Sequence, residues 1–192
     1  MRLGTKMKAV AAAALLALGA GAAQAQISGN VIKIGVLTDM SSLYADIGGP
    51  GSVLAAKMAV EDFKAKEKGL NVEVISGDHQ NKPDVGSQIA NRWYDAEGVD
   101  LIVDTPNSGV ALAVSQVTKD KGKLFINSGA ASSDLTGAKC NANTIHWTYD
   151  TWMLANGTGG AIVRTGGKSW FFLTSDYAFG HALERVTSEV VK

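Results

Sequence analysis

Apolar and polar positions follow two different periods along the chain from residue 31 onward. Short runs rich in Val and Ile are apolar almost throughout, which predicts strands buried in a sheet. Longer segments carry apolar residues three and four positions apart, which predicts helices. The predicted strands are Val31–Leu37, Val72–Asp78, Val99–Asp104 and Lys123–Asn127, and the helices between them are Ser52–Lys66, Asp84–Glu97 and Gly109–Lys121. Strands separated by helices are typical of a parallel α/β sheet with right-handed crossovers.

The first 25 residues have the pattern of a secretory signal peptide. Three basic residues precede an apolar run, Ala9–Ala23, which ends in an Ala-x-Ala cleavage signal at residues 23–25. The run of about 15 apolar residues is shorter than the roughly 20 that span a bilayer, which argues against a membrane anchor. We therefore expect cleavage before Gln26 and a soluble protein of the periplasm.

The charge balance argues against nucleic acid and anionic membranes as partners. The chain has 18 basic and 18 acidic residues, and removal of the leader with its three basic residues leaves 15 basic residues against 18 acidic ones. Binding to either polyanion requires a basic face. Cys140 is the only cysteine, and two interpretations stay open: a disulfide partner outside this chain, or a buried free thiol.

Three loops that follow predicted strands are rich in small and hydroxylated residues: Asp39–Gly51, Thr105–Gly109 and Asn127–Gly137. Open parallel sheets bind ligands beyond the carboxyl ends of their strands, where loops offer donors without bulky side chains. Two of these loops lead into helices, whose positive ends favour an anion such as a carboxylate. Ordinary turn chemistry explains the same composition, so both interpretations stay open.

Three stretches carry a family resemblance: IKIGVLTDMSSLYADIGGPG, VDLIVDTPNSGVALAVSQVTKDKGKLFINSGAASSDLT and TSDYAFGHALERV. Together they resemble the type I solute-binding proteins of ABC importers, in the branched-chain amino-acid-binding group. The resemblance covers residues 32–192 and implies two similar α/β lobes joined by three crossings, with the ligand trapped between them. We expect residues 26–147 to form the N-terminal lobe, and residues 148–192 to form the first crossing and the start of a truncated second lobe.

The resemblance also assigns elements to the second lobe. It places the first crossing at His146–Asp150, a helix at Trp152–Val163, a strand at Lys168–Thr174 and a helix at Gly180–Lys192. We interpret the four tryptophans, Trp93, Trp147, Trp152 and Trp170, as core residues.

Ligand-binding roles carry over from the resemblance to two of the loops. Ser108, with Asn107 beside it, corresponds to the serine that holds the ligand carboxylate, and the next loop supplies backbone groups at Gly129, Ala130 and Ala131. Amino-acid binders have a Thr at the position of Ala131, and its hydroxyl helps to hold the ammonium group. The alanine argues against an α-amino acid, because a buried donor without an acceptor is costly. Ser132 or Ser133 could compensate.

Aromatic residues near the predicted cleft favour a flat ligand. They are Tyr44, Tyr149, Tyr177 and Phe179. Aromatic pairs add about 0.5 to 1.5 kcal/mol beyond the burial of area, so such a cleft would favour an aryl carboxylate. Packing at the hinge or in the core is the alternative role for these rings.

We therefore expect a monomeric carrier that binds a small carboxylate and delivers it to the membrane permease of an ABC importer. A periplasmic sensor of the same fold and a binder of short-chain amides or urea are the alternatives. We expect no enzymatic activity, cofactor or metal, because the sequence has no G-x-S-x-G, no G-x-G-x-x-G and no His or Cys at metal-ligand spacing.

Overall fold

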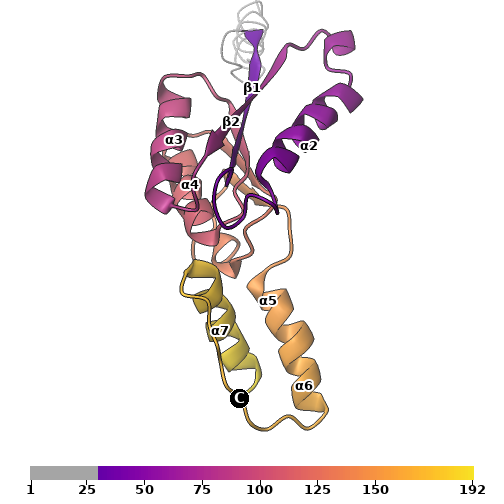
Figure 1. Ribbon diagram of the computed structural model, residues 1–192, viewed down its shortest axis with the longest axis vertical. Helices are drawn as coiled ribbons and strands as arrows, with labels where there is room; N and C mark the ends of the chain where they lie inside the picture. Colours follow the sequence, from indigo (N-terminus) through magenta and orange to yellow (C-terminus); the bar gives the residue numbers. More distant parts are fainter. Residues whose placement is uncertain (1–29) are drawn as a thin grey trace, which may run out of the picture.

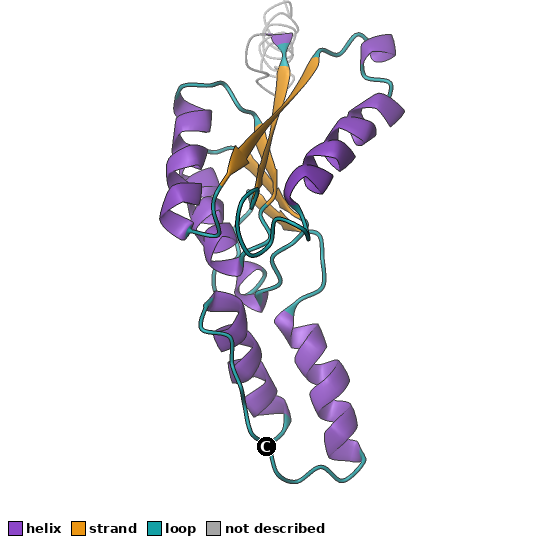
Figure 2. Cartoon of the chain, in the orientation of Figure 1, coloured by secondary structure: helices purple, strands orange, loops and turns teal. Residues whose placement is uncertain are grey.

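The computed structural model describes residues 30–192, so the predicted signal peptide lies outside the described residues. A five-stranded parallel sheet forms the centre of the fold (Figures 1 and 2). Its strands are β1 (Ile32–Thr38), β2 (Val72–Asp78), β3 (Leu101–Asp104), β4 (Leu124–Asn127) and β5 (Thr144–His146). They lie in the order β2-β1-β3-β4-β5. The predicted parallel α/β sheet is confirmed, and β5 is an addition that the sequence pattern did not predict.

The helices between the strands lie within a few residues of the predicted ranges. They are α2 (Gly49–Asp62), α3 (Pro83–Asp95) and α4 (Ser108–Asp120), with short 3₁₀ turns at η2 (Lys66–Lys68) and η3 (Ser133–Leu135). The part after β5 consists of α5 (Thr151–Leu154), the π-helical η4 (Ala155–Gly159), α6 (Gly160–Arg164) and α7 (Ala178–Val190). In Figure 1 these last helices extend away from the sheet at the end where its strands finish.

The hydrophobic core lies between the sheet and the helices α3 and α4. The indole of Trp93 is 2% exposed, as predicted for a core residue, and lies across β1 and β2 at two glycines. A Cβ atom at Gly35 would be 2.6 Å from Cε3 of this ring, and one at Gly77 would be 2.8 Å from Cζ2. Both strands therefore need glycine there, because the ring occupies the space of their side chains.

The opposite face of the sheet is covered less completely. Helix α2 lies over it, and a cavity of about 620 Å³ remains between helix and sheet, lined by apolar side chains such as Ile34, Ala59 and Val103. Met58 of α2 and Phe63, which caps the end of this helix, are each 52% exposed. The apolar face predicted for this helix is thus only partly buried.

The predicted strand at residues 168–174 is wrong. This segment is irregular and pairs with none of the described strands, and Phe171 and Leu173 are 90% and 96% exposed. A strand needs a hydrogen-bonded neighbour. The five strands of the described residues all belong to the central sheet, and none of them pairs with this segment. Two of the predicted core tryptophans are also wrong, since Trp147 and Trp152 are 76% and 59% exposed.

Cys140 is an exposed free thiol, which rules out the interpretation that it is buried. The helices within residues 30–192 all lack the length and apolar composition needed to cross a membrane.

The close packing of Trp93 gives a testable stability prediction. Gly35→Ala places a methyl group against the buried indole, so we expect the free energy of unfolding to fall by about 1 to 3 kcal/mol. Gly51→Ala is the matched control, since Gly51 lies in the first turn of α2 and a Cβ atom there meets nothing within 4 Å. The control should be unchanged or more stable by roughly 0.5 to 1 kcal/mol. Urea unfolding measures both, and equal effects would contradict the packing argument.

Candidate functional site

The three predicted loops meet around one cavity at the carboxyl ends of the strands. The cavity has a volume of about 380 Å³ and is open to solvent on one side. The residues that line it are Tyr44, Ile47, Gly48, Ser52, Asp104, Pro106, Ser108, Ser128, Gly129, Ala131, Tyr149, Tyr177 and Phe179. Seven of the nine residues predicted to bind ligand are in this set, and the two others, Asn107 and Ala130, lie behind the wall of the cavity. The binding roles themselves stay predictions.

A buried carboxylate shapes the first loop. Asp39 accepts hydrogen bonds from the amides of Ser41, Ser42 and Tyr44 and from the Ser42 hydroxyl, at 2.6 to 3.3 Å. Burial opposes ionisation, but these hydrogen bonds, led by that of the Ser42 hydroxyl, hold the pKa of Asp39 below its usual value. The carboxylate thereby folds the loop so that Tyr44 faces the cavity.

Two adjacent residues at the start of α4 have different roles: one caps the helix, and the other lines the cavity. Asn107 is the N-cap, since its Oδ1 accepts from the amide of Val110 at 3.0 Å. Ser108 is the first residue of the helix, is 1% exposed, and its Oγ accepts from the amide of Ser132 at 3.2 Å. The serine hydroxyl is therefore not needed to cap the helix, and it lies at the end where α4 carries orphan amides and positive charge.

The loop after β4 brings its backbone close to the cavity. A Cβ atom at Gly129 would be 2.8 Å from Cα of Pro106, so only glycine allows the two loops to approach so closely. Ala130 is fully buried, and its carbonyl oxygen lies 2.7 Å from Nε2 of His146. Ala131 lines the cavity with a methyl group, where the resemblance implied a hydroxyl in amino-acid binders.

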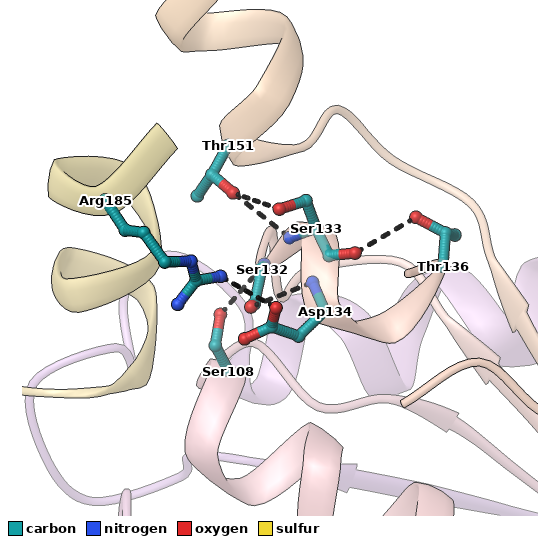
Figure 3. A network of polar contacts seen from close by, with 7 residues as sticks. All are labelled: Ser108, Ser132, Ser133, Asp134, Thr136, Thr151 and Arg185. Carbon is teal, nitrogen blue, oxygen red and sulfur yellow. Dashed lines mark hydrogen bonds and ion pairs between the residues drawn. The ribbon is translucent and has the colours of Figure 1, made fainter. Parts of the chain in front are cut away.

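The same loop holds the last helices in place (Figure 3). Ser133 donates its amide to Oγ1 of Thr151 and accepts a hydrogen bond from that hydroxyl, at 3.1 and 2.9 Å. Arg185 of α7 forms an ion pair with Asp134 at 2.8 Å. Because Ser132 Oγ accepts from the amide of Asp134, both serines that could compensate for Ala131 are already engaged within the loop network.

Aromatic rings close the cavity from two sides of the cleft. The hydroxyls of Tyr44 and Tyr177 are 2.5 Å apart, which joins the first loop to the start of α7. The Tyr177 and Phe179 rings pack at a centroid distance of 5.9 Å. Burial, and then the hydrogen bond with Tyr44, raise the pKa of Tyr177 well above its usual value. The Tyr177 hydroxyl therefore stays protonated at physiological pH, and its hydrogen bond with Tyr44 connects the two sides of the cavity.

Sequence reasoning missed six lining residues: Ile47, Gly48, Ser52, Asp104, Pro106 and Ser128. The most consequential is Asp104, a buried carboxylate that ends β3. An acidic residue directly after an apolar strand was the available signal. It was interpreted only as the end of a strand.

Comparison with known proteins places this geometry among binding proteins. Residues 31–192 match the family model described as periplasmic binding protein. The Leu/Ile/Val-binding protein homolog 1 of Brucella abortus is 33% identical over 136 residues, which cover 69% of this chain and 34% of the relative. The chain thus spans about a third of the length of such curated relatives.

Two solved structures extend the comparison. A periplasmic binding protein from Burkholderia mallei superposes with a TM-score of 0.80 at 52% identity, covering 84% of this chain and 43% of the other. A branched chain amino acid ABC transporter periplasmic ligand-binding protein from Burkholderia xenovorans LB400 has a TM-score of 0.72 at 39% identity, with coverage of 83% and 43%.

The Asp39 loop gives a pH-dependent prediction. Asp39→Asn removes one of the two accepting oxygens, so we expect a loss of about 1 to 3 kcal/mol in the free energy of unfolding at pH 7. The pKa of Asp39 is lowered in the folded protein, so its contribution is present above the ordinary Asp pKa of about 3.9 and is lost as the pH falls through the folded-state value. The stability gap between the two proteins should therefore narrow below about pH 4.

Asp46→Asn is the control, because Asp46 is an exposed carboxylate of the same loop. Urea unfolding of the three proteins between pH 3 and pH 7 makes the comparison. A gap for Asp39→Asn that stays constant over this range would show that the carboxylate charge does not shape the loop.

Proposed function

The chain belongs to the periplasmic binding protein family, and from this premise we propose that it is the extracytoplasmic solute-binding protein of an ABC importer. It captures a small carboxylate, either an aromatic acid or an amino acid, between two lobes and delivers it to the membrane permease of the importer. Residues 26–147 form the N-terminal lobe, and residues 148–192 form the first crossing and the beginning of the second. The protein acts as a monomer in the periplasm after removal of residues 1–25.

The observation that carries this proposal is that one cavity has the N-terminus of α4, which favours an anion, on one side and aromatic rings on another. Ser108 lies at the start of a 13-residue helix, where orphan amides and the helix dipole favour a carboxylate. Tyr177 and Phe179 border the same cavity from the part of the chain beyond the crossing. A ligand between them contacts both parts of the chain, so its binding favours closure.

The names of the relatives support the carrier role. The Brucella abortus relative is a Leu/Ile/Val-binding protein homolog, and the Burkholderia xenovorans structure is the ligand-binding protein of a branched-chain amino acid ABC transporter. A periplasmic sensor that docks on a receptor would use the same cavity and is the second candidate. The two differ in the membrane protein that recognises the closed form.

A ligand screen tests the proposed ligand class. We expect small carboxylates, either aryl acids or amino acids, to raise the melting temperature, since a ligand at 100 times its Kd stabilises by about 2.7 kcal/mol. Because Ala131 lacks the hydroxyl that holds an ammonium group, we expect aryl acids to be preferred to leucine and valine. Differential scanning fluorimetry with both classes, and with acetamide and urea, provides the measurement. Stabilisation by the amides alone would refute the carboxylate assignment.

Ser108→Ala tests the anion-binding end directly. Removal of one charge-assisted hydrogen bond should weaken carboxylate binding by about 10- to 150-fold in calorimetric titration. Ser87→Ala is the control, because its hydroxyl donates to the Pro83 carbonyl on the surface of α3. The control should bind normally. An unchanged affinity with a lowered melting temperature would mean that Ser108 only supports the loop through Ser132.

A further inference from the structure

A buried carboxylate oxygen in the wall of the cleft has no hydrogen-bond partner. Asp104 is 7% exposed, and its Oδ1 accepts from the hydroxyl of Ser128 at 3.2 Å. Its Oδ2 has no partner among residues 30–192. Buried polar atoms are almost always paired, so an orphan carboxylate oxygen needs an explanation.

The backbone at this carboxylate is strained. Asp104 has φ of 79° and Thr105 has φ of 69°, both in the left-handed region. This conformation is rare for a β-branched residue such as Thr105. The Thr105 hydroxyl donates to the carbonyl oxygen of Leu37 at 3.0 Å, which fixes the turn to β1. Strain that the surrounding structure imposes in this way is concentrated at ligand sites.

The position of Asp104 links it to the proposed anion site. Asp104 and Ser128 line the 380 Å³ cavity together with Ser108, and they also border the 620 Å³ cavity under α2. A Cβ atom at Gly48 would be 3.2 Å from Asp104 Oδ2, so the glycine leaves room for the carboxylate beside the start of α2. The cavity therefore contains a negative side chain as well as the positive end of α4.

This arrangement disfavours a ligand that is only an anion. A simple acid bound at Ser108 places its charge in the same cavity as the buried Asp104 carboxylate, and like charges repel more strongly beside a buried group than in bulk water. A ligand with a donor group removes this penalty, because the donor pairs with the orphan oxygen. The methyl group of Ala131 cannot accept a hydrogen bond from such a donor, whereas the free oxygen of Asp104 can.

We propose that Asp104 is a specificity-determining residue, whose free carboxylate oxygen accepts a hydrogen bond from an N–H or O–H donor of the ligand. The ligand is then a small carboxylate that also carries an ammonium, amide or hydroxyl group. This inference rests on the proposed function, since it assumes that the ligand carboxylate binds at Ser108.

Matched ligand pairs test the inference on the unaltered protein. In each pair the first acid carries a donor group and the second lacks it. The pairs are phenylalanine and 3-phenylpropanoate, 4-hydroxybenzoate and benzoate, and 4-aminobenzoate and benzoate. Calorimetric titration should show the donor-bearing member of at least one pair binding about 10- to 150-fold more tightly. Equal or weaker binding of the donor-bearing member in every pair that binds would overturn the role of Asp104 and leave the proposed function standing. Failure of all these acids to bind would overturn both.

Asp104→Asn then tests the residue itself. Asn tolerates the left-handed backbone as Asp does, so this variant keeps the turn while it removes the charge. We expect the preference for the donor-bearing ligand to fall by about 10-fold or more, and binding of its partner without the donor to improve. Asp46→Asn, at an exposed position of the first loop, is the control and should keep the preference. A preference that persists in Asp104→Asn would overturn the assignment, and the comparison of pairs on the unaltered protein decides the matter if the variant does not fold.

Discussion

Parallel hydrogen bonding places Gly77, Leu37, Asp104, Asn127 and His146 in one row across the sheet, and the loops of the candidate site begin just beyond this row. Parallel strands end at the same edge, so residues far apart in the chain meet there. A shift of one strand by one residue would turn its last side chain to the other face. The cavity therefore depends on this register. The packing of Trp93 on two glycines holds two of the strands in it.

We place the proposed ligand site in the cleft at the strand ends because of the chemistry of its lining and not because of its size. The cavity between α2 and the sheet has about 620 Å³ and a mostly apolar lining that also includes Ser52, Asp104 and Ser128, whereas the cleft at the strand ends has about 380 Å³. Of these two cavities, the cleft alone has Ser108 at the start of α4 and aromatic rings from both parts of the chain. An apolar cavity offers little to orient a charged ligand, because such a ligand needs a few well-placed polar groups.

Periodicity was sufficient for the sheet and its helices, because each strand of the first lobe finds its partners within this chain. The strand at residues 168–174 was expected from the resemblance and is wrong, because this segment pairs with none of the strands in residues 30–192. In the candidate site, position after a strand identified the loops that contain Tyr44 and Ser108, and the family resemblance then singled out Ser108. It could not separate the capping role of Asn107 from a binding role, since that depends on which oxygen faces the helix amides. The sequence did place an acidic residue, Asp104, at the end of an apolar strand, but its positive φ and its unpaired carboxylate oxygen depend on the folded structure.

A crystal structure of the protein grown with the small acid that binds it most tightly tests the central claim most directly. The account predicts the ligand carboxylate within hydrogen-bond distance of the Ser108 hydroxyl at the start of α4, with Tyr177 or Phe179 against its other end. A ligand found between α2 and the sheet, with the cleft at the strand ends empty, would contradict it.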